Sequence, residues 1–423
     1  MTTNSRTLAE WLAWMEAQHP KTIALGLERV QAVAERLAVT RFSAKVVLVG
    51  GTNGKGSTCA FLEALALAHG LRVGVYTSPH LLHYNERVRL NGVDTSDAAL
   101  VASFEAVEAA RENVPLTFFE FGTLAALVQF RDAGLDLIVL EIGLGGRLDA
   151  VNLVEPDVSV VTTVDIDHKD WLGDTIEAIA REKAGIYRPG KPALFGDSPV
   201  PASLRAYAQA IGADLRLQGE AFGYARQGSR CSVHVGAVRF DDMPLPTLLL
   251  PNAATAVAAY LALPGVQWRP EAVAEALSKA RIAGRFQRLP GPVKTLVDVA
   301  HNPQAAGKLA ELLEAAPNPG RTLAVVAMLG DKDIPGTLSR MVDVVDGWFV
   351  AGLPGPRGTE ADVVQGALRE LGIEAGAYAD VATALQAAWR EARDGDRVVV
   401  FGSFYTVAAA LAIRPGVSCA TPD

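Results

Sequence analysis

The stretch that decides the fold is residues 46–57, VVLVGGTNGKGS, in which an apolar run meets four closely spaced glycines. A buried strand, a glycine turn and a following helix are the arrangement in which backbone N–H groups face an anion. The spacing departs from the usual phosphate loop, G-x-x-x-x-G-K-[ST]. Val49 stands where the first glycine belongs, and Gly56 separates Lys55 from Ser57. The stretch is either a variant nucleotide site or a glycine-rich turn with a solvent-facing lysine, and so many glycines favour the nucleotide site.

Short apolar runs alternate with amphipathic helices on the carboxyl side of this stretch, as far as residue 184. This alternation predicts a mostly parallel sheet covered by helices on both faces. On the amino side we expect two helices, the first opened by a capping box of Thr7 and Glu10. We expect strands at 73–76, 136–141 and 158–164, and helices at 97–111, 120–131 and 174–184, the last capped by Asp174.

The character of the sequence changes twice further on. Residues 213–250 alternate apolar and polar side chains, which predicts an antiparallel edge to the sheet. After a Gly/Pro-rich connector the βα alternation restarts. We therefore expect an α/β protein with a larger phosphate-loop domain, residues 1–284, and a smaller Rossmann-like α/β domain, residues 285–423.

Composition narrows the function classes. The 423 residues carry a formal net charge of −8 without a basic run, which argues against nucleic-acid binding. Three cysteines without a CxxC pair indicate free thiols in a reducing compartment. The N-terminus has no apolar signal core, and no uncharged run reaches membrane-spanning length. We expect a cytoplasmic monomer without a membrane or nucleic-acid partner.

Polar residues follow two of the predicted strands. Glu141 ends one strand, and His168 lies shortly after the next. Ligands bind at the carboxyl ends of parallel strands, where a carboxylate can hold Mg²⁺. On the residues alone, Glu141 is either a metal ligand or a loop carboxylate, and His168 is either a ligand or a hydrogen-bonded surface residue.

Lys183 is the most informative single residue. It follows Ile176 and Ile179 at helical spacing, so it belongs to the inward apolar stripe of its helix. Burial lowers the pKa of a lysine, and a neutral amine can react with CO₂ to form a carbamate that binds a metal. The alternative is a lysine whose stem is buried and whose ammonium reaches water.

In the second domain, the strand in TLVDVAHNPQAAGKL ends at Asp298, and His301 precedes a helix capped by Asn302. Asp298 lies where a carboxylate could contact a ribose or base, but it could equally be a turn residue. Arg285, in the connector, is either a phosphate contact or a structural ion-pair partner.

Several segments together resemble one family. They are TNGKGS, YTSPHLLHYNERVRLNG, LTFFEFGTLAAL, EIGLGGRLDAVN, DHKDWLGDTIEAIAREKAGI, LPNAATAVAA, GRFQ, DVAHNPQAA and FGSFYTV. In this order, over nearly the whole chain, they resemble the folylpolyglutamate synthase/dihydrofolate synthase family of the Mur ligase superfamily. The phosphate loop of those ATP-dependent amide ligases departs from the usual spacing in the way seen here.

The resemblance implies ATP binding between the two domains, with two Mg²⁺ ions and a monovalent cation. It implies catalytic roles for Lys55, His168 and Lys183, with Lys183 carbamylated. The implied metal ligands are Ser78, Glu141, His168 and Lys183. The implied ATP contacts are Gly54, Lys55, Gly56, Ser57, Asn252, Arg285, Asp298 and His301.

Further segments match those that hold the pterin substrate in bifunctional bacterial members. They are Thr22, Ile23, Ala24 and Leu25; Thr117, Phe118, Phe119 and Glu120; and Leu148, Asp149 and Ala150. Phe119 would stack on the pterin ring. Where such members usually carry aspartate, this chain has Ala24, which cannot hydrogen-bond the pterin. The departure bears on the balance between the dihydrofolate synthase and the folylpolyglutamate synthase activity that the resemblance implies.

The implied reaction adds L-glutamate to 7,8-dihydropteroate and to tetrahydrofolates through an acyl phosphate. Lys55, Arg285 and the metals would neutralise charge on the moving phosphoryl group. One alternative is a Mur-type cell-wall ligase, which would carry a sugar-nucleotide-binding domain where only about fifty residues precede the loop. Another is a nucleotide-dependent switch without ligase chemistry, which would not need Glu141, His168 and Lys183.

Overall fold

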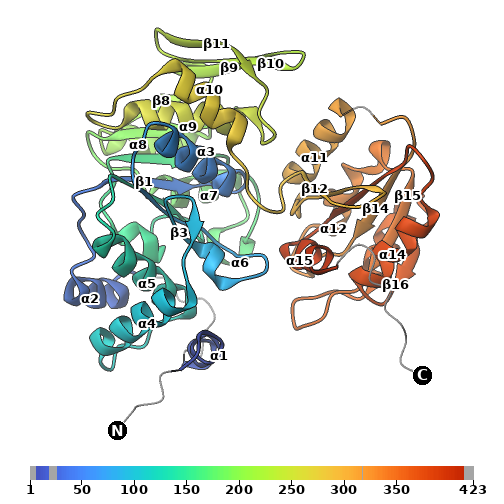
Figure 1. The fold of residues 1–423 in the computed structure, drawn as a ribbon, viewed down its shortest axis with the longest axis horizontal. Coiled ribbons are helices and arrows are strands. Elements are labelled where there is room, and N and C mark those ends of the chain that lie inside the picture. Colours follow the sequence, from blue (N-terminus) through green and yellow to red (C-terminus); the bar gives the residue numbers. More distant parts are fainter. Residues whose placement is uncertain (1–5, 19–25, 317, 414–423) are drawn as a thin grey trace. The chain divides into compact units, whose positions relative to one another are not determined.

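The computed structural model describes residues 6–18, 26–316 and 318–413 (Figure 1). The chain divides into two compact units, Met1–Arg281 and Ile282–Asp423. Each unit is built around a mostly parallel sheet flanked by helices, which confirms the predicted fold class.

The first unit contains an eight-stranded sheet in the order β4-β3-β2-β5-β1-β6-β7-β8. In this order β2, β5, β1, β6, β7 and β8 pair in parallel. Strands β3 and β4 add an antiparallel edge beside β2. Residues of β1, β2, β5 and β6 are buried almost throughout, because helices cover both faces. The strands are β1 (Lys45–Gly50), β2 (Val73–Tyr76), β3 (Val88–Leu90), β4 (Val93–Asp94), β5 (Leu137–Glu141), β6 (Val158–Val161), β7 (Pro192–Phe195) and β8 (Asp214–Leu217).

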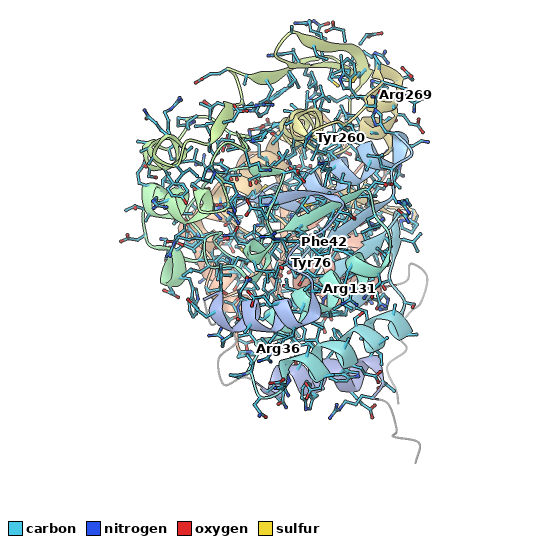
Figure 2. All side chains as sticks on the ribbon, turned by 90° about the vertical axis from the view of Figure 1, so that its left-hand side faces the viewer. Arg36, Phe42, Tyr76, Arg131, Tyr260 and Arg269 are labelled. Carbon is cyan, nitrogen blue, oxygen red and sulfur yellow. The ribbon has the colours of Figure 1, made fainter. Side chains whose placement is uncertain are left out.

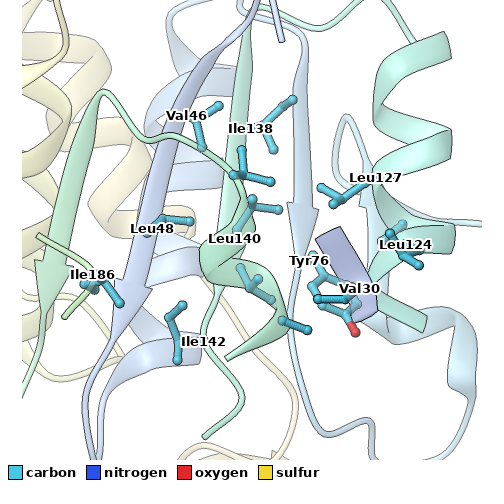
Figure 3. Close-up of a cluster of buried hydrophobic side chains, with 14 of the residues drawn as sticks. Val30, Val46, Leu48, Tyr76, Leu124, Leu127, Ile138, Leu140, Ile142 and Ile186 are labelled. Atoms are coloured by element: carbon cyan, nitrogen blue, oxygen red, sulfur yellow. The ribbon is translucent and has the colours of Figure 1, made fainter. Parts of the chain in front are cut away.

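One face of this sheet carries the apolar cluster drawn in Figure 3, in which Val46 and Leu48 of β1 lie beside Ile138 and Leu140 of β5. Tyr76 joins the same cluster. The helices that contribute to it are α1 (Leu8–Gln18), α2 (Glu28–Leu37), α4 (Asp97–Arg111), α5 (Phe118–Asp132), α7 (Ile176–Ala184) and α8 (Ala202–Ala210).

A second group of helices packs together outside that cluster. It consists of α3 (Lys55–Ala68), α9 (Leu250–Ala262) and α10 (Pro270–Lys279). In Figure 2, Tyr260 on α9 and Arg269 before α10 lie on one side of Tyr76, and Arg36 on α2 lies on the other. The helix that follows the phosphate loop therefore packs on β1, β2 and β5, and α9 packs beside it on β6 and β7.

The prediction for residues 213–250 was wrong. Only β8 joins the main sheet, and it does so in parallel. The following strands form a separate three-stranded antiparallel sheet, because they cover α9 and α10 instead of extending the main sheet. Phe240 of that sheet contacts Trp268 edge to face at 5.4 Å between ring centroids. The three strands are β9 (Phe222–Gln227), β10 (Arg230–Val235) and β11 (Val238–Pro244).

Two smaller predictions concern helix ends. The capping box at Thr7 and Glu10 is present, since each residue accepts a hydrogen bond from the other's backbone N–H. The cap of α7 is Thr175 and not Asp174: the Thr175 hydroxyl accepts from Ala178 N–H at 3.2 Å. The short elements between these helices are η1 (Tyr84–Arg87), η2 (Ala150–Leu153) and α6 (Lys169–Leu172).

The second unit contains a six-stranded sheet in the order β12-β13-β17-β14-β15-β16, antiparallel only at β12. Its strands are β12 (Gln287–Leu289), β13 (Lys294–Val297), β14 (Thr322–Val326), β15 (Gly347–Ala351), β16 (Gly376–Tyr378) and β17 (Arg397–Phe401). Its helices are α11 (Pro303–Ala315), α12 (Ile334–Ser339), η3 (Val342–Val344), α13 (Ala361–Glu370), α14 (Val381–Glu391) and α15 (Phe404–Ala412). Side chains of α11, α12 and α13 form its main apolar cluster with the sheet.

Candidate active site

The glycine loop joins β1 to α3, and Thr162 and Thr163, which directly follow β6, are hydrogen-bonded to it. The hydroxyl of Thr162 donates to the Asn53 carbonyl at 2.6 Å, and Asn53 N–H donates to the Thr163 hydroxyl at 3.0 Å. Gly51 has φ of +141°, and a Cβ there would collide with the Thr162 hydroxyl. The loop therefore needs glycine at this position both for its backbone conformation and for its closeness to β6.

The amino end of α3 is left open by the loop. Gly54 occupies the position before the helix with φ of +86°, and no side chain in the described part of the chain caps α3. The amide groups of the first turn and the positive end of the helix dipole therefore face outward, as an anion site requires. Lys55 lies over the same loop, with its ammonium 3.1 and 3.2 Å from the carbonyl oxygens of Gly51 and Thr52.

Other predicted nucleotide contacts of this unit lie at the same place. Gly56 and Ser57 are buried in the first turn of α3. Asn252, buried on α9, lies so close to Gly54 that a Cβ on that glycine would be 2.6 Å from the Asn252 side-chain oxygen. The tight contact links the loop to α9.

Glu141 and Ser78 lie at the carboxyl ends of the neighbouring strands β5 and β2. Ser78 N–H donates to a Glu141 carboxylate oxygen at 3.1 Å, and Glu141 is only 4% exposed. Two of the four predicted metal ligands are therefore adjacent.

These donors suit Mg²⁺. That ion keeps several waters and is usually held by one or two carboxylates together with substrate phosphates. Across the described residues, no group of three or more His, Cys, Asp or Glu side chains gathers as a metal site. A buried carboxylate such as Glu141, on the strand paired with β1, suits a metal that arrives with a nucleotide.

Lys183 is buried, at 4% exposure, as its place in the apolar stripe of α7 predicts. Burial, and then the positive charge of Lys55, lower the pKa of Lys183 to about 7, while Asp167 and Asp149 act in the opposite direction. A large share of this amine is therefore neutral near pH 7, which is the form that reacts with CO₂.

The backbone around Lys183 is in direct contact with the loop that follows β5. A Cβ on Gly146 would lie 2.8 Å from the Glu182 carbonyl and 2.9 Å from the Lys183 carbonyl. Arg147 N–H donates to the Glu182 carbonyl at 3.0 Å, and Gly185 is equally close to Arg147. Glycine at these two places lets the loop close over the end of α7, with Gly146 against backbone carbonyls and Gly185 against Arg147.

His168 lies at the beginning of α6 in the left-handed region, with φ of +53°. Its N–H donates to Asp167 at 2.8 Å, and its Nε2 is 3.8 Å from the other Asp167 carboxylate oxygen. The side chain is 39% exposed, so it is less enclosed than Glu141 and Lys183. A non-glycine residue in this backbone conformation is uncommon and occurs often at functional positions.

The predicted substrate segment at the start of α5 is fixed by a capping box. Thr117 N–H donates to the Glu120 carboxylate at 2.7 Å, and the Thr117 hydroxyl accepts from Glu120 N–H at 3.2 Å. Glu120 also pairs with Arg29 at 2.9 Å, so its carboxylate has protein partners. Phe119 lies against Gly143, and its ring centroid is 6.2 Å from that of Tyr76. Thr22, Ile23, Ala24 and Leu25 lie outside the described residues.

Asp149 connects the predicted substrate segment at 148–150 with the loop that follows β5. Its buried carboxylate accepts from Leu144 N–H at 2.8 Å and from Val151 N–H at 2.9 Å. Burial raises the pKa of Asp149 to about 6, against these hydrogen bonds and the charge of Lys55. Ala150 is buried directly after it, and Leu148 is half-buried before it.

Sequence reasoning missed Arg87. Its guanidinium lies over the rings of Tyr84 at 5.2 Å and Phe118 at 5.7 Å, and its Nε donates to His80 Nδ1 at 2.9 Å. Burial, and then the Arg87 charge, lower the pKa of His80 to about 4. Arg87 lies in the quoted segment YTSPHLLHYNERVRLNG, but its approach to Phe118 depends on a contact between elements thirty residues apart.

The second unit holds three predicted nucleotide contacts. Asp298 is buried at the end of β13, where it accepts from Phe286 N–H at 2.8 Å and Ala300 N–H at 2.9 Å. Burial raises the pKa of Asp298, and the charge of Arg285 opposes this. Arg285 lies 5.5 Å from the Phe404 ring, and His301 Nδ1 is 2.8 Å from the Val299 carbonyl.

Comparison with known families covers both units. The profile of the Mur ligase middle domain matches residues 49–216, and that of the Mur ligase glutamate ligase domain matches residues 284–404. None of the described helices has the length and apolar character needed to cross a membrane.

Individual relatives match along nearly their whole length. Dihydrofolate synthase/folylpolyglutamate synthase of Escherichia coli is 46% identical over 401 residues, which cover 95% of this chain and 94% of that protein. The structure of Escherichia coli FolC in complex with DHPP and ADP superimposes with a TM-score of 0.93 at 45% identity, covering 96% of this chain and 97% of that chain.

Another solved structure is a bifunctional folylpolyglutamate synthase/dihydrofolate synthase with Mn, AMPPNP and L-glutamate bound. It has a TM-score of 0.91 at 45% identity and covers 96% of this chain and 98% of that chain. The similarity extends over both units and over the loop, the strand ends and the α7 segment described above. The chain therefore belongs to the bifunctional dihydrofolate synthase/folylpolyglutamate synthase family of Mur-type ligases, and it is an ATP-dependent ligase of that family.

Proposed function

We propose that this enzyme joins the amine of L-glutamate to the carboxylate of 7,8-dihydropteroate, and to that of tetrahydrofolates, through an acyl phosphate. The observation that carries the proposal is the open amino end of α3 at Gly54, with the buried Glu141 on the strand paired with β1 and the buried Lys183 within reach of the Lys55 charge. An anion site next to a buried carboxylate and a lysine of low pKa suits phosphoryl transfer from a metal-bound nucleotide. Relatives are described with ADP, AMPPNP, Mn, DHPP and L-glutamate, which supports these ligands.

In the first step a carboxylate oxygen of the pterin acid attacks the γ-phosphorus of ATP, and ADP leaves. Carboxylates resist amines because their leaving group would be oxide, and phosphorylation replaces this with phosphate. The N–H groups at Gly54, Gly56 and Ser57 would bind the phosphates, and Lys55 would turn from its own loop carbonyls to the transferred group.

In the second step the glutamate amine attacks the acyl carbon, and phosphate leaves as the amide forms and the amine loses its proton. Mg²⁺, when bound, would neutralise charge on the phosphates and on the transferred group. Glu141 and the Ser78 hydroxyl would hold it, with His168 and carbamylated Lys183 completing two sites. Binding of a monovalent cation near them remains a proposal as well.

The pterin acid would lie against Phe119, whose ring packs near Tyr76 and the loop at Gly143. Asp149 and its neighbours Leu148 and Ala150 would hold this loop in place. We add Arg87 to this site as the cation that receives a carboxylate of the substrate. Its charge acts on the Tyr76 hydroxyl, and its face is covered by Phe118. The segment at Thr22–Leu25 remains a proposed part of the site.

We also propose nucleotide contacts for Asn252 in the first unit, and for Arg285, Asp298 and His301 in the second. The close approach of the Asn252 side chain to Gly54 supports this role. Asp298 is a buried carboxylate at a strand end, where ligands bind in parallel sheets. We further propose that the enzyme acts as a cytoplasmic monomer, which cell fractionation and light scattering would test.

The test is phosphate release from ATP with 7,8-dihydropteroate and, separately, tetrahydrofolate, each with and without L-glutamate. We expect sustained release only with both a pterin acid and glutamate. Release from ATP alone at the same rate would indicate a nucleotide switch. Release that needs a cell-wall precursor in place of the pterin acid would indicate the other Mur-type activity.

A further inference from the structure

The segment between β2 and β3, residues 78–87, has a rigid backbone. The Glu86 carboxylate accepts from the N–H groups of Leu81, Leu82 and His83 at 2.7, 2.8 and 2.7 Å. Thr77 N–H donates to the Arg87 carbonyl at 2.9 Å, which ties the end of the segment to its beginning. His80 and Arg87 therefore have fixed main-chain positions, and only their side chains remain to be oriented.

The Arg87 guanidinium lies in an aromatic setting without a carboxylate. In the described ranges, no Asp or Glu lies within ion-pair distance of it. The rings of Tyr84 and Phe118 lie at 5.2 and 5.7 Å from its central carbon. Stacking against rings restrains the plane of a guanidinium but allows it to rotate within that plane. The Tyr76 hydroxyl is hydrogen-bonded to the Arg87 side chain, and a further directional contact at Nε is needed to complete the orientation of the guanidinium.

His80 provides that contact. Arginine Nε–H can only donate, so His80 Nδ1, at 2.9 Å, must be an acceptor, and the ring must be the neutral tautomer with its proton on Nε2. The imidazole is itself packed near Tyr84, with 5.7 Å between the ring centroids. The bond occupies the edge of the guanidinium that carries Nε and one terminal nitrogen, so that the edge formed by the two terminal nitrogens is directed elsewhere.

We propose that His80 is a positioning residue, whose neutral ring holds the Arg87 guanidinium in the orientation that receives the carboxylate of the pterin acid. The inference rests on the proposed function, because Arg87 needs a substrate carboxylate to bind. His80 contributes through Arg87 and not by contact with the reacting atoms. Its loss should therefore weaken binding of the pterin acid more than it slows the chemistry.

The experiment compares His80→Phe with His80→Asn. Phenylalanine keeps a ring against Tyr84 but removes the acceptor, and the asparagine side-chain oxygen can occupy the place of Nδ1. For His80→Phe we expect the KM for 7,8-dihydropteroate to rise about tenfold, the effect of one hydrogen bond to a charged group. The kcat and the KM for ATP should stay within about twofold, and His80→Asn should restore the pterin KM to within about threefold of wild type.

A second arm repeats His80→Phe in an Arg87→Met background, where we expect less than about a twofold further change in the pterin KM. An unchanged pterin KM in His80→Phe would overturn the proposal, and so would an equal rise of this KM in His80→Phe and His80→Asn. A tenfold rise caused by His80→Phe in the Arg87→Met background would overturn it as well. Thermal melts of all variants show whether folding is intact. If the wild-type enzyme released no phosphate in response to the pterin acid, the proposed function would be refuted. Failure of the proposed function is thereby distinguished from failure of the His80 proposal, which only the variants test.

Discussion

Each unit has a strand–turn–helix element at the carboxyl end of a parallel strand, but the two helix ends differ. In the first unit, Gly54 precedes α3 and leaves its amide groups without a side-chain cap among the described residues. In the second, Asn302 precedes α11 and accepts from Ala305 N–H at 2.9 Å, followed by Pro303, which has no N–H to satisfy. One helix end can receive an external anion, and the other is closed by its own sequence.

The difference shows that parallel sheet topology alone does not make a phosphate site. Both turns lie where ligands bind in α/β proteins. What distinguishes them is whether the chain supplies its own cap or leaves the helix dipole and amides exposed. The first unit carries the charged residues Lys55, Glu141 and Lys183 near the open helix end. At the closed end of the second unit, the Asn302 cap stabilises the helix.

The largest effect should come from the charges around the open end. Lys183→Ala removes the amine proposed to carry the carbamate, so we expect phosphate release to fall about a hundredfold or more. Burying a lysine is unfavourable, so Lys183→Met, of similar length, should lose activity to the same extent without a lower melting temperature. Turnover like that of wild type in either variant would refute the metal role of Lys183.

The next effect tests the open end itself. Gly54→Ala places a Cβ 2.6 Å from the Asn252 side chain in a backbone conformation that costs about 1–2 kcal/mol for alanine, so the KM for ATP should rise at least about tenfold. The matched control is Gly70→Ala at the other end of α3. Gly70 has φ of +77° and open space around its Cβ position, so it reproduces the strain without the collision. Equal ATP kinetics in the two variants would contradict the importance of this loop geometry.

A third prediction concerns pH. The pKa of Lys183 is lowered to about 7, so the neutral amine dominates above pH 7 and declines below it. At a fixed concentration of dissolved CO₂, reactivation of CO₂-depleted enzyme should be about tenfold slower at pH 6 than at pH 8. Carbon-13 NMR with labelled bicarbonate should show the carbamate signal appear at the same rate. Reactivation that does not vary with pH would argue against a carbamate.

The smallest effect belongs to the closed end. Asn302→Ala removes the cap of α11 and should lower the unfolding free energy of the second unit by about 1 kcal/mol, or about 3 °C in melting temperature. Asn302→Asp keeps an accepting oxygen and serves as the control. If Asn302→Ala raised the KM for ATP and left the melting temperature unchanged, this helix end would also have a ligand role.

Local patterns predicted most of the elements. Helix Asp97–Arg111, strand Val73–Tyr76 and helix Pro303–Ala315 with its Asn302 cap follow from periodicity and capping residues. Periodicity placed Lys183 on the inward stripe of its helix but left open whether its ammonium reaches water, and the structure shows the residue buried. The strands of residues 222–244 were misplaced because alternation shows that a strand has one apolar face, but not which element covers that face.

Part of the candidate site could also be predicted from the sequence. Strand-end residues such as Glu141 can be found from the sequence, because topology brings strand ends together. Arg87 and His80 could not, since the roles proposed for them depend on side-chain packing between the β2–β3 segment and α5. The residues at Thr22–Leu25, where Ala24 departs from the family pattern, are not described, so their roles remain predictions.

The contact between Gly146 and the end of α7 has a consequence for how this enzyme can evolve. Burial lowers the pKa of Lys183, and two glycines allow the close packing around it: Gly146 meets the Glu182 and Lys183 carbonyls, and Gly185 meets Arg147. Any side chain at either glycine would separate the two segments, hydrate the amine and return it to its cationic form. Two residues without side chains thus tune the proton affinity of a third. With the proposed carbamate on Lys183, substitution at either glycine should raise the CO₂ concentration needed for activity before it unfolds the chain.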